Sequence, residues 1–237
     1  MPTFTHGKNA TVLANGYNLS SYFNSVSASG SSETAEVSTF GDNSKKYIPG
    51  LKDATFSVEG YYDATAGAVD ESLAAMLGNE TVWVTVMNAD AVGARGYAAK
   101  TIATTVDTGA EIGGAVTVSA EGQSTTGIDG IVVLKALSAV TAGGNGTQVD
   151  NTTSTTTGAV GYLQVTGISG TPTLVAKVQH STDGSTWVDL ITFTSVTTAN
   201  TAERIAVSGT VNRYLRALWT ISGGSPSATF HLSADRL

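Results

Sequence analysis

The sequence has no cysteine and only three histidines, His6, His180 and His231, among its 237 residues. Without cysteine, disulfide bonds and thiolate metal sites are excluded. No two histidines lie near each other in the sequence, so the spacing of a helical metal site is missing as well. We therefore expect neither a metal ion nor a cofactor.

Long apolar runs are also missing. No stretch of 18 apolar residues occurs, so no transmembrane helix is expected and no membrane partner. The start, Met1–His6, lacks the basic and apolar regions of a secretory signal. Charged residues make up only 13% of the chain, whereas Thr, Ser, Gly, Ala and Val are abundant, a composition that favours strands joined by small-residue turns.

The negative charge is confined to one part of the chain. Residues 1–137 carry seven basic and fourteen acidic groups, whereas residues 138–237 carry five of each. This difference predicts two units under different electrostatic demands. An acidic surface does not bind nucleic acid, because binding relies on Lys and Arg displacing counterions. Solubility is the alternative explanation of the excess.

Alternating apolar residues predict several strands in the first part. In Ala54–Tyr62, Phe56 and Val58 alternate with polar residues, the period of a half-buried strand. The other expected strands are Ala10–Ala14, Thr81–Met87, Tyr97–Val106, Ala115–Ala120 and Ile128–Leu137. One helix is expected at Ala68–Leu77, where apolar residues form a single stripe, acids occupy the first turn and Gly78 follows as the stop.

The segment Ser25–Gly50 is expected to be a long loop. It begins with small residues and ends in turn and breaker signals. A loop of this length in a compact domain is disordered or functional. Phe40, Tyr47 and Ile48 provide apolar anchors, which favours a loop that docks onto a partner.

The rest of the chain predicts a second all-β unit, placed at residues 146–237, after a first domain at 1–140 and a linker at 141–145. Turns are expected at Thr182–Gly184 and Ser222–Pro226. Their spacing is typical of a sandwich or jelly roll. The expected strands are Ala159–Val165, Thr173–His180, Thr186–Thr194, Ala202–Val207, Val211–Ile221 and Ser227–Ser233, and the expected core is Trp187, Ile191, Phe193, Trp219, Phe230 and Leu232.

Catalytic motifs are scarce, and we expect no enzyme. There is no nucleophile elbow and no phosphate loop, and Gly143–Gly146 lacks the following helix that a nucleotide site needs. The carboxylate pairs Asp70/Glu71 and Glu33/Glu36 could suit a glycosidase only at the right separation in space. His180 is expected at the rim of a strand, and His231, which alternates with Phe230 and Leu232, is expected to face outward.

Aromatic side chains on a β-sandwich can also stack on sugars. Tyr162, Trp187, Tyr214 and Trp219 are the candidates, with core packing or an interface as the alternative role. A carbohydrate-binding module therefore stays open beside a structural protein.

The first 137 residues resemble the major tail tube proteins of siphophages. An N-terminal arm precedes Gly16-Tyr17-Asn18, and a small-residue segment leads to Thr39-Phe40-Gly41-Asp42. Lys45–Leu51 then enters the strand Phe56–Asp63, followed by the helix and the strand Thr81–Met87. The order and spacing of these features carry the resemblance. Residues 145–237 lie outside the family pattern and look like a phage-associated sandwich or jelly-roll appendage.

The resemblance implies a mainly β fold, with an N-terminal antiparallel two-sheet sandwich or half-barrel, one flanking helix, and a second β-sandwich or jelly-roll domain. It implies a virion protein of the phage tail, made in the host cytoplasm, which forms hexameric rings stacked into a tube. Its partners would be further copies of itself and the tape measure, tail terminator and baseplate proteins. The loop that bridges adjacent rings would contain Phe40, Asp42, Lys45, Lys46, Tyr47 and Ile48.

A tube that passes genomic DNA should repel it, and the acidic half of the chain would form the tube. The residues expected to line the channel are Glu33, Glu36, Asp107, Glu111 and Glu121. The competing interpretations are a capsid decoration or head–tail joining protein and a carbohydrate-binding β module.

Overall fold

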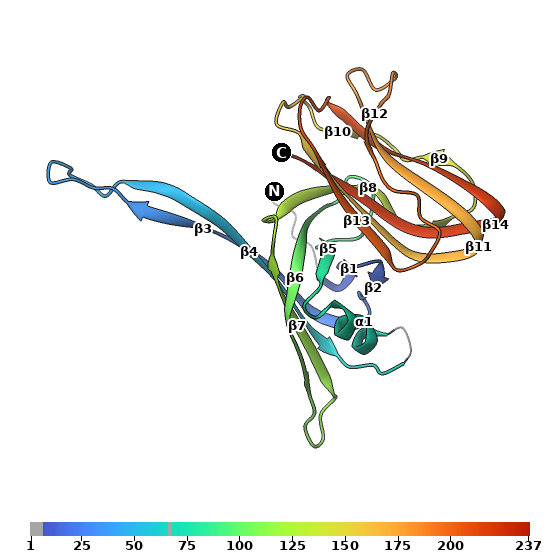
Figure 1. Ribbon diagram of the computed structural model, residues 1–237, viewed down its shortest axis with the longest axis horizontal. Helices are drawn as coiled ribbons and strands as arrows, with labels where there is room; N and C mark the ends of the chain where they lie inside the picture. Colours follow the sequence, from blue (N-terminus) through green and yellow to red (C-terminus); the bar gives the residue numbers. More distant parts are fainter. Residues whose placement is uncertain (1–6, 66–67) are drawn as a thin grey trace. The chain divides into compact units, whose positions relative to one another are not determined.

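The computed structural model describes residues 7–65 and 68–237; His6 lies outside these ranges. The chain is mainly β, with 63% of residues in strands and 5% in helices, which confirms the expected fold class (Figure 1). The first elements are a 3-10 turn at Gly7–Asn9, β1 (Thr11–Ala14), β2 (Tyr17–Asn18), β3 (Phe23–Glu36), β4 (Tyr47–Tyr61), α1 (Val69–Met76), β5 (Glu80–Val86), β6 (Arg95–Gly109) and β7 (Thr117–Ser124). The remaining strands are β8 (Asp129–Val140), β9 (Gly144–Asn145), β10 (Val149–Asp150), β11 (Ala159–Ser181), β12 (Val188–Thr192), β13 (Thr201–Val207) and β14 (Tyr214–Arg236). Within the described ranges, no helix is long and apolar enough to cross a membrane.

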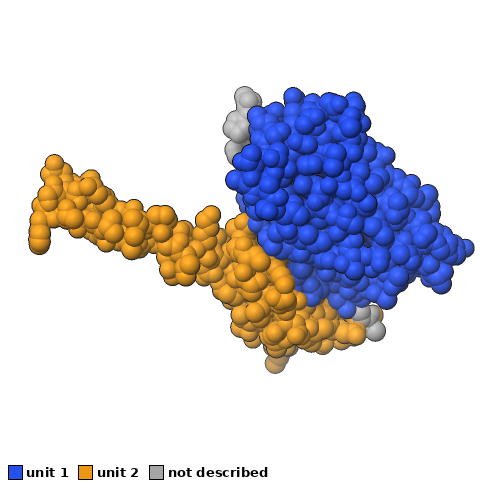
Figure 2. Space-filling model, turned by 45° about the horizontal axis from the view of Figure 1, so that its top comes forward, with its two compact units in different colours: residues 1–21, 81–98, 129–237 blue, residues 22–80, 99–128 orange. Residues whose placement is uncertain are grey.

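The contacts within the chain divide it into two compact units (Figure 2). Unit 1 contains residues 1–21, 81–98 and 129–237, and unit 2 contains residues 22–80 and 99–128. The units alternate along the chain, so this division differs from the expected succession of a first domain, a linker and a second domain.

Unit 2 is built on an antiparallel sheet in the order β3, β4, β7 and β6. Most of the segment expected as a long loop belongs to this sheet, because β3 and β4 form one long hairpin in which Ser25 pairs with Glu59 and Glu36 with Tyr47. The loop expectation was wrong for residues 25–36 and 47–50. Their Ser-rich sequence has few large apolar residues to form an alternating pattern, and the strand pairing itself provides the regularity.

The helix α1 forms where the apolar stripe predicts it. Val69, Leu73 and Met76 are buried, and Asp70 and Glu71 occupy the first turn, where the helix dipole favours negative charge. Gly78 follows with a φ of +74°, the left-handed conformation that glycine adopts at little cost after a helix. The helix lies beside the sheet of unit 2 (Figure 1).

In unit 1, two long strands run antiparallel over their whole length. The pairing of β11 with β14 begins where Ala159 lies opposite Arg236 and ends where Ser181 lies opposite Tyr214, with register shifts near Gly167 and Gly170. Leu163 from the first half of β11 and Leu174 from the second half belong to one buried cluster, so the two halves pack face to face as in a sandwich.

The turn expected at Ser222–Pro226 was wrong, because β14 continues through it. Gly223 has a φ of +120° and Ser225 a φ of +44°, opposite Gly170 with a φ of +77°. The glycines allow an irregularity in both strands without ending the pairing. The turn signals at Thr182–Gly184 are confirmed, since the Asp183 carboxylate accepts hydrogen bonds from the backbone amides of Ser185 and Thr186 at 2.8 Å.

The first half of β11 is buried on both faces. Leu163 and Val165 join the sandwich core, whereas Val160 and Tyr162 pack with Leu13, Val82, Val84, Ala98 and Ile131 from the start of the unit. Gln164, fully buried, accepts a hydrogen bond from the amide of Gly16 (2.6 Å) and donates one to the carbonyl of Val82 (2.7 Å). Unit 1 therefore has two cores on either side of β11.

A buried polar cluster lies at the same place. The Tyr162 hydroxyl donates to the Asp129 carboxylate, and Arg204 donates from Nε to the Tyr162 oxygen (2.8 Å) and from a terminal nitrogen to Asp129 (3.0 Å). Tyr162 is fully buried, and burial together with the neighbouring Asp129 raises the pKa of its hydroxyl. The three side chains satisfy one another inside the protein.

The expectation that His231 faces outward was wrong. Its side chain is fully buried, with Nδ1 3.2 Å from a carboxylate oxygen of Asp90. Alternation gives an outward side only to a strand with one covered face, and here both faces of β14 are covered, since Phe230, His231 and Leu232 are all fully buried.

The expected boundary near residue 140 leads to a first testable prediction. β8 pairs with β14, and its Val132 and Leu134 belong to the sandwich core. We expect a fragment of residues 129–237 to unfold at a higher urea concentration than one of residues 146–237, because the shorter fragment lacks these side chains and exposes an edge of β14. Equal stability of the two fragments would show that residues 146–237 fold without help from β8.

Candidate functional site: the polar face of the unit 2 sheet

The sheet of unit 2 has two chemically opposite faces. On β4, Ala54, Phe56 and Val58 are buried, as are Val118 and Ala120 on the paired strand β7. The residues between them point to the other side. This opposite side, which we call the polar face, consists of Ser25, Ser27, Ser57, Glu59, Thr105, Asp107, Ser119 and Glu121, each exposed or half-buried.

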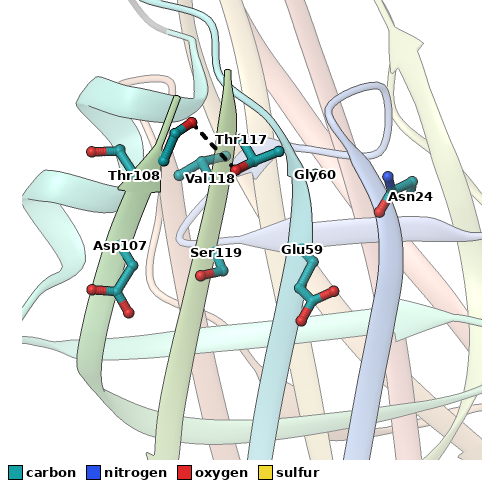
Figure 3. A pocket seen from close by; sticks show the side chains of 9 residues that line it. Asn24, Glu59, Gly60, Asp107, Thr108, Thr117, Val118 and Ser119 are labelled. Atoms are coloured by element: carbon teal, nitrogen blue, oxygen red, sulfur yellow. Dashed lines mark hydrogen bonds between the residues drawn. The ribbon is translucent and has the colours of Figure 1, made fainter. Parts of the chain in front are cut away.

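Strand register places the acids of the polar face in rows. Ser119 lies opposite both Glu59 on β4 and Asp107 on β6, so the two carboxylates flank a hydroxyl (Figure 3). In the next row, Glu121 lies between Ser57 and Thr105. None of the eight side chains carries positive charge. The polar face is therefore a surface of carboxylates and hydroxyls.

The face continues toward the far part of the hairpin. Gln123 donates a hydrogen bond to the carboxylate of Asp53, and Ile102, opposite Gln123, is an apolar residue on this side. At the other end, Asn24, Glu59, Asp107, Thr117 and Ser119 are among the side chains around a hollow of about 380 Å³ (Figure 3). It is open and has hydroxyl and carboxylate groups at its rim, so it holds water easily.

Both edges of this sheet are open. β3 pairs with β4 on one side, and in the part of the chain that the structure describes no strand pairs with its other side. The same is true of β6 from Thr105 to Gly109 on the side away from β7. Unpaired strand edges present free backbone donors and acceptors, which are ready to pair with another chain.

The hairpin projects from the rest of unit 2 as an arm, which we define as residues 31–53 (Figure 2). Every residue of the arm is exposed except Asp42, which is half-buried. Phe40 is fully exposed and Leu51 is 76% exposed, while Tyr47 and Ile48 are each 52% exposed. Exposed apolar surface of this kind is typical of an interaction site.

Polar contacts order the tip of the arm. Asp42 accepts hydrogen bonds from the amide (2.9 Å) and hydroxyl (3.1 Å) of Thr39 and pairs with Lys46, which lowers the pKa of its carboxyl, the Lys46 contact being the largest cause. Lys45 pairs with Glu36 at 2.9 Å. The carbonyl of Lys46 accepts from Val37 at 2.8 Å, which closes the hairpin. These charged residues therefore hold the tip, and its apolar side chains stay free.

The five acids expected to line a channel are distributed over three places. Asp107 and Glu121 lie on the polar face, Glu33 and Glu36 lie on the arm, and Glu111 lies in the turn between β6 and β7. Glu59 was not among the acids expected at the channel, although the alternation in Ala54–Tyr62 already placed it on the other face of the strand from Phe56 and Val58. Their role as a channel lining stays a prediction.

The other candidates have structural contacts. Tyr162 is buried, Trp187 lies under the Arg216 guanidinium at 4.1 Å, and Trp219 donates to the carbonyl of Ala142 (3.0 Å) and packs edge-on against Phe230. Gly144, which was expected in a linker, belongs to β9 and pairs with Trp219 of β14. In the described residues, no group of three or more His, Asp or Glu side chains is placed to hold a metal ion.

No family model matches the sequence, and no curated protein matches it. Similar solved structures include a chain of the virion of a native gene transfer agent particle, with 12% identity and a TM-score of 0.43 over 54% of this chain and 98% of that one. The SPP1 Dit protein, described as a hub of the phage adsorption apparatus, has 16% identity and a TM-score of 0.37 over 96% and 99%. A chain of the phage p2 baseplate has 10% identity and a TM-score of 0.36 over 96% and 98%. These TM-scores all lie below 0.5, a likeness too low to assign a function to this chain.

Proposed function

We propose that this chain is a virion structural protein whose copies form stacked hexameric rings of a phage tail tube, through which genomic DNA passes. The observation that carries the proposal is the polar face, an acidic sheet surface bounded by two open strand edges. Edge-to-edge pairing of β3 in one copy with β6 in the next closes both edges. It turns the polar face of every copy to the same side of a continuous barrel.

The dimensions of such a barrel support the proposal. Neighbouring strands lie about 4.8 Å apart, so six copies of a four-stranded sheet give a circumference of about 115 Å and a diameter of about 37 Å. Barrels with far fewer strands already enclose an aqueous channel, and strand tilt widens them further. The apolar face then lies on the outer side of the barrel wall, away from the channel.

The charge of the polar face suits the passage of DNA. Glu59, Asp107 and Glu121 are negative and none of their neighbours on the face is positive, so the channel wall repels phosphate. Hydroxyl groups between the carboxylates keep the wall hydrated. A duplex that passes over the eight residues of the polar face meets no cation that would hold it.

The assembly state of the purified protein tests the proposal. We expect rings or tubes in electron micrographs and large particles in light scattering at high protein concentration, or once a tail initiator complex is present. A stable monomer under all of these conditions would contradict the proposal. Monomers that bind polysaccharide would support a carbohydrate-binding module instead.

Reversing the charge of the polar face leads to a second prediction. Phage particles carrying Glu59→Lys, Asp107→Lys and Glu121→Lys should assemble but eject DNA more slowly, by roughly tenfold at low salt, because lysines bind phosphate. The defect should ease as salt screens the charges. DNA release is measured after receptor triggering, at several salt concentrations.

Two sets of variants control this experiment. Glu59→Gln, Asp107→Asn and Glu121→Gln remove the negative charge without adding a positive one, and they should slow ejection much less. Glu33→Lys places the new charge on the arm, away from the polar face. Unchanged ejection from the polar-face lysine variant would leave the acids as a solubility feature.

A further inference from the structure

Two adjoining hollows in unit 1 share Arg95. One, of about 360 Å³, is lined by Met87, Arg95, Gly96, Tyr97, Gly130 and Ile131 and is mainly apolar. The other, of about 120 Å³, is polar, and its lining includes Arg95, Gly130, Asp235 and Arg236. Together they form a surface with an apolar half and a basic half, which we call the Arg95 hollow.

The space in the Arg95 hollow depends on a glycine. Gly130 lies opposite Tyr97 in the pairing of β8 with β6, and a Cβ atom added to Gly130 would meet nothing within 4 Å. The backbone amide of Gly130 donates to the carboxylate of half-buried Asp235 at 3.0 Å. The floor of the hollow is therefore open backbone beside an aromatic side chain that is 44% exposed.

The two arginines of the hollow differ in how firmly hydrogen bonds hold their guanidinium groups. Arg236 donates to the carbonyls of Thr153 and Asn151, so its guanidinium is held in place. Arg95 is exposed, and within the described part of the chain no hydrogen bond or ion pair holds its guanidinium. The lining contains the two bases Arg95 and Arg236 and the one acid Asp235, so the net charge of the hollow is positive.

The turn between β6 and β7 carries complementary groups. Ile112 at its tip is fully exposed, and Glu111 beside it is an exposed acid without a side-chain partner among the described residues. The amide of Gly114 donates to the carbonyl of Glu111 at 3.1 Å and Gly113 has a φ of +86°, so a tight turn presents both side chains. An acid and an aliphatic side chain thus stand next to each other at the end of a hairpin.

We propose that the Arg95 hollow receives Glu111 and Ile112 of a second copy of this chain, with Ile112 in the apolar half and Glu111 paired with Arg95. The inference rests on the proposed function, because the second copy is the next subunit of the same tube. β6 begins at Arg95 and ends at Gly109, directly before the turn. The hollow lies at the start of β6 and the turn follows the end of β6. A contact between the hollow of one copy and the turn of the next copy is therefore head to tail, and such a contact repeats from copy to copy in a stack.

The absence of cysteine from the chain permits a direct test by disulfide capture. Gly130→Cys and Ile112→Cys are made in separate full-length chains, mixed, assembled and oxidised. We expect a cross-linked dimer only in the mixture, since a disulfide needs Cβ atoms about 3.8 Å apart. Phe40→Cys mixed with Gly130→Cys is the matched control, because Phe40 is the other fully exposed apolar tip residue.

Charge exchange gives a second readout. Arg95→Glu and Glu111→Arg should each raise the protein concentration needed for stacking, by roughly tenfold for the loss of one favourable pair and its replacement by a repulsive one. The two changes in one chain should restore stacking. Gly130→Ala, whose added Cβ meets nothing within 4 Å, should narrow the hollow and oppose stacking while leaving thermal unfolding of the unassembled protein unchanged.

The outcomes separate this inference from the proposed function. Tubes with the 112–130 cross-link support both. Tubes without it, or with a 40–130 cross-link in its place, overturn the inference and leave the tube. Cross-linked dimers in the absence of any tube support the contact and contradict the tube, and a protein that neither stacks nor cross-links overturns both.

Discussion

Deletion of Thr39–Ile48 is expected to leave a folded protein that no longer stacks. The deletion removes the tip of the arm with Phe40, Tyr47 and Ile48, while Thr34 and Pro49 remain paired and the residues between them form a short turn. The rest of the sheet keeps its pairing and its buried face. Circular dichroism should therefore match that of the intact chain, and tubes should be absent from electron micrographs.

Point variants distinguish the apolar contact from the length of the arm. Phe40→Ser with Ile48→Ser keeps the hairpin and removes two exposed apolar side chains, and it should reproduce most of the stacking defect. The matched control is Ser44→Ala, a change at an exposed position of the same tip that removes no apolar surface and should have no effect. Normal tubes from the deletion variant would remove the arm from the assembly mechanism.

Arg204→Met is expected to lower the free energy of unfolding by about 3 kcal/mol, the usual cost of breaking a buried ion pair. Arg204 and Asp129 have side chains that are only 15% and 9% exposed. Removing the guanidinium leaves the Asp129 carboxylate and the Tyr162 hydroxyl inside the protein with one partner fewer. Urea denaturation of the unassembled chain, followed by circular dichroism, measures the change.

Arg213→Met is the matched control for this prediction. Arg213 also pairs with an aspartate, Asp150, but both side chains are 42% exposed and water can replace the contact. We expect a much smaller change than for Arg204→Met. Equal losses from the two variants would mean that the Tyr162 cluster contributes no more than a surface pair.

Local patterns in the sequence predicted the elements that have their own apolar periodicity. The strand with Phe56 and Val58 and the helix with Val69 and Leu73 both form, because each buries one face against its surroundings. The same alternation predicted the polar side of β4. Two of the eight residues of the polar face, Ser57 and Glu59, were thus visible in the sequence.

Features that depend on distant pairing could not be predicted in this way. The arm was expected as a loop, because its strands lack an alternating apolar pattern and the hairpin register is not a local property. The pairing of β8 with β14 joins segments far apart in the sequence, such as Ala139 with Thr229, and no local pattern reports it. Burial of His231 likewise depends on residues distant in the sequence, since its imidazole lies against the carboxylate of Asp90.

A helical reconstruction by electron cryomicroscopy of the assembled protein would show which strands pair between subunits and which side chains face the channel. We predict a tube in which β3 of each subunit pairs with β6 of its neighbour, and in which Glu59, Asp107 and Glu121 line the inner wall. A tube with these three residues on its outer surface, or an assembly that leaves the β3 and β6 edges unpaired, would contradict it.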